Sequence, residues 1–267
     1  MQGLSDINMN ELIYIVGFTF LGSIGALIGG LLLLSQENLA KKLSHFLASF
    51  AAGTLLGAAF FDLLPEAVHE AEGSGIDIFF WTLAGLIFFF ILERFIHWFH
   101  HHDEHHHANE EGHIHKEAKA TIPLVIIGDT VHNLLDGIVI AATFMTSIEL
   151  GIVTTLAVIA HEIPQEMGDF GILLHKGMSR MKILLVNVIS ASVSIASAIT
   201  TFYIGNVIEG LIPIFLAVTA GFFIYVAVSD LIPEIHYEKR KGIAQIETLL
   251  LLLGVVVIYL SVTFLHH

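Results

Sequence analysis

Eight long apolar segments dominate the sequence, and each is long enough to cross the hydrocarbon core of a bilayer. Because backbone polar groups find no water inside a bilayer, such segments cross it as α-helices. Only 13% of the residues are charged, as is typical of integral membrane proteins. We therefore predict an all-α transmembrane domain over residues 1–267, with spans at about 11–34, 44–65, 77–98, 121–144, 150–175, 181–204, 211–234 and 243–265.

The positively charged residues fall on only one side of this predicted bundle. All eleven Lys and Arg residues lie in or beside the loops that follow the first, third, fifth and seventh spans. Loops rich in Lys and Arg stay in the cytoplasm, so the pattern predicts that both termini are outside. The N-terminus has no basic region before its first apolar run and no cleavage site, so we expect no cleaved signal peptide.

Composition also limits the partners. The chain has no cysteine, so disulfides and thiolate metal sites are excluded, and a bound metal ion needs nitrogen and oxygen ligands. The formal net charge of −14 argues against nucleic acid as a partner. The lipid bilayer is the partner that this composition favours.

A polar stretch from His161 to Asp169, reading His-Glu-Ile-Pro-Gln-Glu-Met-Gly-Asp, interrupts the fifth apolar segment. A carboxylate at the centre of a span costs roughly 3 kcal/mol on insertion scales, so these acidic residues need an interior role. At 3.6 residues per turn, His161 and Gln165 lie one above the other, and Glu162, Glu166 and Asp169 form an adjoining stripe. The pattern predicts a metal site or a proton path.

The preceding span carries a second polar face. His132, Asn133 and Asp136 share it, and Asp129 lies one turn earlier on the same side. Spacing of i, i+4 lets two side chains converge on one ion. An interhelical hydrogen-bond network without any ion is the alternative. Histidines and carboxylates repeated on two consecutive spans favour the functional interpretation.

A short repeat occurs twice. Asp62-Leu-Leu-Pro-Glu66 ends the second span and Asp230-Leu-Ile-Pro-Glu234 ends the seventh. Because the predicted topology runs these two spans in opposite directions, the repeat is inverted. Inverted repeats that flank a site near the membrane midplane are a recurring transporter plan. The alternative for so short a match is that Pro-Glu only marks the end of a helix in each copy, without an internal repeat.

Small residues recur where helices would approach closely. Gly25 and Gly29 in the first span, and Gly53 and Gly57 in the second, have small-xxx-small spacing. Serines at positions 190, 194 and 197 give the sixth span a mildly polar face. We interpret both sets as packing residues, with pore lining as the alternative for the serines.

The loop over residues 99–119 is rich in histidine, Asp and Glu. Its composition cannot bury a core, so we expect disorder. Clustered imidazoles and carboxylates bind Zn²⁺ loosely, which suits a cytoplasmic metal-receiving or metal-sensing loop. A spacer with incidental histidines is the alternative.

These motifs resemble the ZIP (Zrt/Irt-like) divalent metal transporters. The stretch from His161 to Asp169 is similar to the His-Glu-x-Pro-His-Glu-x-Gly-Asp signature of the LIV-1 branch, and departs from it at Gln165. The segment His132-Asn-Leu-Leu-Asp136-Gly137 is similar to the fourth-helix motif of the family, His-Asn-x-x-(Asp/Glu)-Gly. Eight spans, outside termini and a His-rich loop after the third span are also family features.

The resemblance implies a 3+2+3 helix arrangement with a binuclear metal site on helices four and five. One metal position would use His132, Asp136, His161 and Gln165. The second would use Asn133, Asp136 and Glu162, with Gln165 or Glu166 as further ligands. The family moves Zn²⁺, and in some members Fe²⁺, Mn²⁺, Co²⁺ or Cd²⁺, toward the cytoplasm. The resemblance also implies a homodimer in the cell membrane, which is the inner membrane in a Gram-negative bacterium.

Two other functions fit part of the pattern. His161-Glu-x-x is close to the His-Glu-x-x-His motif of zinc metalloproteases, some of which act inside membranes. Position 165 is Gln, however, so a required metal ligand is missing, and we expect no enzyme activity. A metal sensor without transport is the other alternative, and metal flux into proteoliposomes separates the three.

Overall fold

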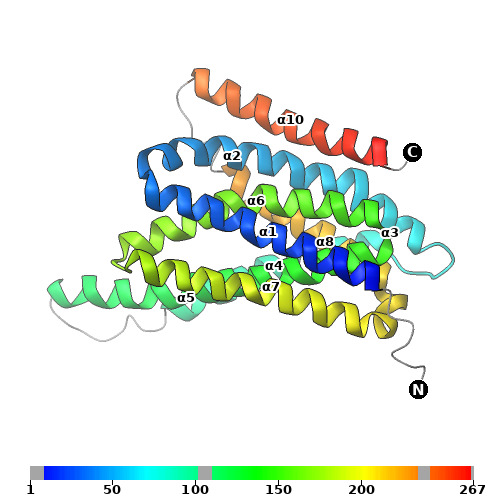
Figure 1. Ribbon diagram of the computed structural model, residues 1–267, viewed down its shortest axis with the longest axis horizontal. Helices are drawn as coiled ribbons and strands as arrows, with labels where there is room; N and C mark the ends of the chain where they lie inside the picture. The colour runs from blue at the N-terminus through cyan, green and yellow to red at the C-terminus, as the bar shows by residue number, and fades with distance from the viewer. Residues whose placement is uncertain (1–8, 102–109, 234–240, 266–267) are drawn as a thin grey trace.

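The computed structural model describes residues 9–101, 110–233 and 241–265, and almost all of this backbone is helical. Figure 1 shows an elongated helical bundle in which the start of the first helix and the end of the last lie at the same end. The elements are α1 (Met9–Ser35), α2 (Glu37–Ala58), η2 (Ala59–Leu63), α3 (Leu64–Glu70), α4 (Ile78–His101), α5 (Glu110–Thr146), α6 (Ile148–His175), α7 (Arg180–Ile208), η3 (Glu209–Leu211), α8 (Ile212–Val226), η4 (Ala227–Leu231) and α10 (Lys241–Leu265).

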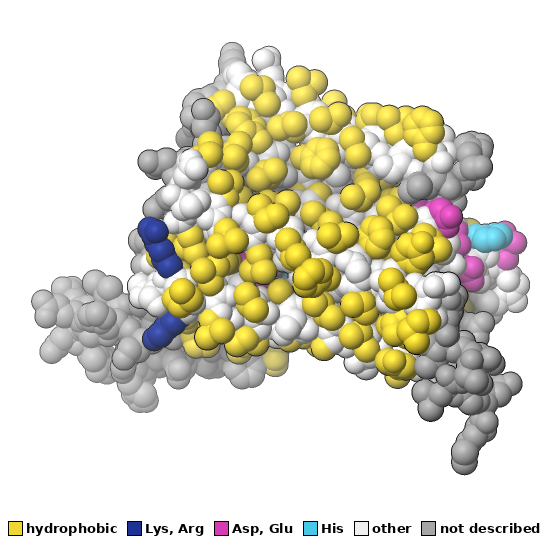
Figure 2. Space-filling model, viewed as in Figure 1, with side chains coloured by type: hydrophobic (Ala, Val, Ile, Leu, Met, Phe, Trp, Pro, Cys, Tyr) yellow, Lys and Arg dark blue, Asp and Glu magenta, His cyan; other side chains and the backbone are white. Residues whose placement is uncertain are grey.

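The predicted all-α fold is confirmed for the described residues, and each predicted span overlaps one of these helices or a continuous run of them. Among the described residues, seven helical segments are long and apolar enough to cross a membrane. The remaining predicted span, the fifth at 150–175, falls on α6, whose polar stretch adds charged residues and lowers its hydropathy. Figure 2 shows apolar side chains over most of one face, with basic groups at one end and acidic groups at the other. The chain is a multi-pass membrane protein.

The segment after α4 departs from the predicted disordered loop at 99–119. The helix α5 begins at Glu110, so the backbone is helical well before the predicted start of the span at residue 121. Ala, Lys and Glu are strong helix formers and extend the helix beyond its apolar part. Residues 102–109, with four of the eight histidines of that loop, lie outside the described residues.

The helices α5 and α6 pack against each other within the bundle. The helix α6 also contacts α1 and α2, and α5 also contacts α7. Two further close pairs, α2 with α10 and α4 with α8, complete the bundle. The polar faces of α5 and α6 are therefore covered by other helices, away from lipid.

Glycines allow several of these helices to touch backbone to backbone. A Cβ added to Gly53 of α2 would lie 2.0 Å from the carbonyl oxygen of Leu251 in α10, and one added to Gly254 would lie 2.3 Å from that of Phe50. Without a side chain at either position the two backbones approach closely, as small residues permit in membrane helices. The contact at Gly53 supports its interpretation as a packing residue.

The two copies of the short repeat share a backbone feature. Each begins inside a π-helix, Asp62 in η2 and Asp230 in η4. In each, an amide bonds the carbonyl five residues back: Leu64 to Ala59, and Ile232 to Ala227. A proline follows each π-helix. It has no backbone N–H and so cannot donate the α-helical hydrogen bond to the carbonyl four residues back. The two similar sequences therefore give the same local structure where α2 and α8 end, and these two helices run in opposite directions (Figure 1).

Candidate metal centre

One residue connects the two helices that carry the polar faces. Ser147 lies between α5 and α6, and its hydroxyl accepts a hydrogen bond from the amide of Leu150 at 3.1 Å, which caps the start of α6. So short a turn makes the helices antiparallel neighbours. His132 lies 15 residues before Ser147 and His161 lies 14 residues after it, so the two histidines come level with each other.

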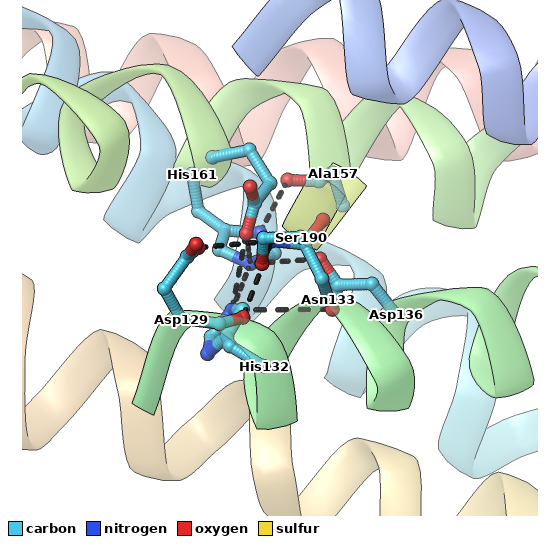
Figure 3. Close-up of polar contacts among 8 residues, drawn as sticks. Asp129, His132, Asn133, Asp136, Ala157, His161 and Ser190 are labelled. Carbon is cyan, nitrogen blue, oxygen red and sulfur yellow. Dashed lines mark hydrogen bonds and ion pairs between the residues drawn. The ribbon is translucent and has the colours of Figure 1, made fainter. Parts of the chain in front are cut away.

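Four side chains meet between the helices: His132 and Asp136 from α5, and His161 and Glu162 from α6. We call them the four-residue cluster. Each offers one nitrogen or oxygen atom, and these four atoms all lie within 4.8 Å of one another. Figure 3 shows His161 pointing from α6 toward His132 and Asp136 on α5. The sequence motifs thus converge in space.

The spacing of these atoms suits a single ion. The Nε2 atoms of His132 and His161 are 3.0 Å apart, and Nε2 of His132 is 3.3 Å from Oε1 of Glu162. Nε2 of His161 is 3.7 Å from Oδ2 of Asp136. Two ligands on tetrahedral zinc, each about 2.0–2.1 Å from the metal, lie roughly 3.3 Å apart. The four atoms can therefore surround one Zn²⁺ after small adjustments.

The tautomer of His161 is fixed by the backbone. Its Nδ1 lies 3.1 Å from the carbonyl oxygen of Ala157. A carbonyl oxygen only accepts, so Nδ1 carries the proton and donates it. In the neutral ring the lone pair is then on Nε2, which faces the cluster. Metal-ligating histidines are commonly oriented in this way through their second nitrogen.

The carboxylates of the cluster are buried and incompletely satisfied. Asp136 is 2% exposed and Glu162 is 3% exposed. Both oxygens of Asp136 and Oε1 of Glu162 have no hydrogen-bond partner among the described residues. A buried carboxylate without partners is costly. A divalent cation at the cluster would satisfy these oxygens together with the two imidazoles.

Three other predicted site residues lie outside the cluster. The amide nitrogen of Asn133 donates to Oδ1 of Asp129 at 2.9 Å and to the hydroxyl of Ser190 at 3.3 Å, on the side of α7 (Figure 3). Gln165 lines a cavity beside His132. Glu166 is buried, and neither of its oxygens has a hydrogen-bond partner among the described residues.

The cavity has a volume of about 430 Å³ and lies between α4, α5, α6 and α8. It reaches His132 and extends past Asp129 and Asp169 toward the part of the bundle where α4 and α6 end and α5 begins. Glu93 of α4, which accepts a hydrogen bond from the hydroxyl of Tyr225, also lines it. An aqueous path from the cluster would therefore have acidic walls.

Sequence reasoning missed two aromatic neighbours of the cluster. The ring of Phe222 lies 5.2 Å from that of His132, and the ring of Phe223 lies 6.1 Å from that of His161, centroid to centroid. Both belong to α8 and cover the histidines with apolar surface. Nothing in the sequence distinguishes them from the other apolar residues of that span.

Comparison with known proteins identifies the family of the chain, and the matched residues include α5 and α6. A family model described as "ZIP Zinc transporter" matches residues 10–123 and 101–261. The chain belongs to the ZIP zinc transporter family. This confirms the resemblance drawn from the motifs of α5 and α6.

Curated ZIP proteins align over different lengths of the chain. Zinc transporter ZIP13 of Pongo abelii is 32% identical over 228 residues, which are 80% of this chain and 65% of that protein. Zinc transporter ZIP4 of Mus musculus is 44% identical over 110 residues, 41% of this chain and 16% of the relative. Zinc transporter ZIP6 of Homo sapiens is 38% identical over 118 residues, again 16% of the relative. The chain thus matches only part of each of these ZIP proteins.

Proposed function

We propose that this protein transports divalent metal ions, foremost Zn²⁺, across the membrane into the cytoplasm, and that the ion passes through the four-residue cluster. The observation that carries the proposal is the convergence of two imidazoles and two carboxylates on one point between two membrane helices. Ligands of this kind inside a bilayer are costly unless a cation uses them. Membership of the ZIP family supports the same cargo.

The chemistry of the ligands indicates which divalent ions the protein transports. Imidazole and carboxylate together bind Zn²⁺ well and also accept Fe²⁺, Mn²⁺, Co²⁺ and Cd²⁺. We assign His132, Asp136, His161 and Glu162 as the main ligands, with Gln165 and Asn133 at the margin of the site. Because the ion must also leave, moderate affinity suits a transport site.

The orientation of the bundle in the membrane follows from its charged ends. Lys176, Arg180 and Lys182 flank the turn between α6 and α7. By the positive-inside rule this end faces the cytoplasm and both chain termini face outside. The cavity beside His132 extends toward this end, so we infer that the structure represents an inward-facing state. The cell membrane is the proposed location.

We assign the 3+2+3 helix arrangement of the family to this chain, with α5 and α6 as the central pair. The matching π-helices at Asp62 and Asp230 support an inverted relation between the flanking helices. In that arrangement the whole chain forms one transmembrane domain. We propose that two copies of the chain assemble as a homodimer. The segment 102–109 would lie on the cytoplasmic side, where its histidines could receive or sense the metal.

Flux into proteoliposomes tests the function directly. Purified protein is reconstituted with a zinc indicator inside the vesicles, and external Zn²⁺ is added. We expect saturable zinc entry above that of protein-free vesicles. Binding without entry would indicate a sensor, and cleavage of a membrane peptide without entry would indicate a protease; either result would refute the transport function.

Gln165→His is expected to tighten zinc binding and slow zinc release. Gln165 lines the cavity beside His132, and imidazole is a stronger ligand for zinc than a neutral amide. We expect the zinc Kd to fall by roughly tenfold, a change of about 1.4 kcal/mol. Isothermal titration and stopped-flow uptake would measure both effects. The control is Gln165→Asn, which keeps the amide, and equal affinity for Gln165→His and wild type would place residue 165 outside the site.

A further inference from the structure

Only one side chain of the four-residue cluster reaches the cavity. His132 lines the cavity, whereas Asp136, His161 and Glu162 are not among the described residues on its wall. The side chain of His132 is 15% exposed, and those of the other three are 1–4% exposed. An ion that passes between the cluster and the cavity therefore moves past His132.

Two stacked aromatic rings border this point. The ring of Phe222 in α8 lies 5.2 Å from that of His132, centroid to centroid, with the planes at 61°. It also stacks on the ring of Phe89 in α4, with the centroids 4.2 Å apart and the planes at 30°. Both phenylalanines line the cavity, and both are buried. We call Phe89 and Phe222 the aromatic pair.

The cavity wall changes character along its length. Toward the end where α4 and α6 finish, it carries four carboxylates: Glu93, Asp129, Asp169 and Asp230. Carboxylate oxygens accept hydrogen bonds from the water shell of a cation. Beside His132 the aromatic pair presents carbon atoms, which form no such bonds. A hydrated ion is therefore supported in the acidic part of the cavity and loses that support at His132.

Divalent ions differ in how readily they give up water. Mg²⁺ dehydrates reluctantly and usually keeps several waters when it binds to a protein. Zn²⁺ exchanges its water for imidazole nitrogen and carboxylate oxygen and binds with four ligands. The acidic wall attracts both ions, because its charge acts on any cation. Discrimination between them therefore requires a place where water cannot follow the ion.

We propose that Phe222 determines the metal specificity of the four-residue cluster. Its ring, held in place by Phe89, keeps water out of the space beside His132, so an ion binds there only if it exchanges water for imidazole. This inference deepens the proposed function and rests on it, but the selectivity of metal binding can be measured without transport.

Replacement of Phe222 with alanine tests this role. The full-length protein in detergent is titrated with Zn²⁺, and the titration is repeated against added Mg²⁺ at constant ionic strength. The readout is the ratio of the Kd for Mg²⁺ to the Kd for Zn²⁺. We expect Phe222→Ala to lower this ratio roughly tenfold, because water enters the space of the ring and lets the ion keep one or two more hydrogen-bonded waters.

Phe79→Ala is the matched control. It makes the same chemical change in the first turn of α4, where Phe79 is 73% exposed, and should leave the ratio as in wild type. Phe222→Leu keeps an apolar side chain and should retain more of the ratio than Phe222→Ala does. If Phe222→Ala fails to fold, Phe89→Ala removes the ring on which Phe222 stacks and should lower the ratio in its place.

Three results would each overturn the proposal: equal affinity of wild type for the two ions, an unchanged ratio in whichever of Phe222→Ala and Phe89→Ala folds, or an equal fall in Phe79→Ala. A loss of affinity for both ions by the same factor leaves the ratio unchanged and would assign Phe222 to packing alone. A protein that shows the expected ratios but no zinc entry into vesicles would refute only the transport function.

Discussion

Replacing Asp136 with asparagine is expected to reduce zinc uptake to the level of protein-free vesicles while leaving the fold at least as stable. Oδ2 of Asp136 lies 3.7 Å from Nε2 of His161, and neither carboxylate oxygen has a hydrogen-bond partner among the described residues. The nearest nitrogen atoms to these oxygens are the imidazoles of the cluster, at 3.7–3.9 Å, and no Lys or Arg among the described residues pairs with Asp136, so removing its buried charge relieves a desolvation cost. The variant should therefore lose function without losing structure.

Two measurements check this expectation: zinc flux in proteoliposomes and the thermal unfolding midpoint of the metal-free protein in detergent. Asp77→Asn is the matched control, because Asp77 is exposed in the loop before α4 and the chemical change is identical. His161→Ala should lose uptake as Asp136→Asn does. Near-normal flux in both variants would remove α5 and α6 from the transport path, and a lower unfolding midpoint for Asp136→Asn would indicate a structural role.

Gly137→Ala is expected to displace α5 from α7 and to disturb the metal ligands on α5. A Cβ at Gly137 would lie 2.0 Å from the carbonyl oxygen of Ser194 and 2.1 Å from the hydroxyl of Ser197. A hydroxyl can rotate away, but a backbone carbonyl cannot, so the helices must separate. Overpacking of this kind costs about 1–3 kcal/mol. Because His132 and Asp136 are on the same helix, zinc affinity should fall together with stability.

Gly128→Ala provides the control for this prediction. Gly128 is also in α5, but nothing lies within 4 Å of a Cβ added there. The two variants therefore make the same change in the same helix, with and without a backbone neighbour. Thermal unfolding and zinc titration in detergent should separate them. Equal stability of Gly137→Ala and wild type would show that the contact between α5 and α7 tolerates a side chain.

The sequence was informative about the helices because a bilayer leaves few choices. Long apolar runs must become helices, and each of the eight predicted spans has its counterpart among the described helices. Helical spacing also placed His132 with Asp136, and His161 near Glu162, on inward faces. The basic residues of alternate loops predicted an even number of crossings, and the start of α1 and the end of α10 lie at the same end of the bundle (Figure 1).

The sequence was less informative about contacts between helices. Spacing along α5 put Asn133 beside His132, yet its amide nitrogen bonds Asp129 and Ser190. Spacing along α6 put Glu166 on the stripe of Glu162, yet Glu166 is not a member of the four-residue cluster. Periodicity fixes which side of a helix a residue occupies to within about a third of a turn, and the rotation of each helix against its neighbours decides the rest.

The sequence by itself determined an all-helical membrane protein of the ZIP family with metal ligands on two neighbouring spans, because composition, loop charge and 3.6-residue spacing act locally along the chain. Only the tertiary structure decided which four ligands share one point, that Phe222 and Phe223 cover the histidines, and that Gly137 touches the backbone of Ser194. Those features depend on how far apart and at what rotation the helices pack. That packing is set by side chains distant in sequence.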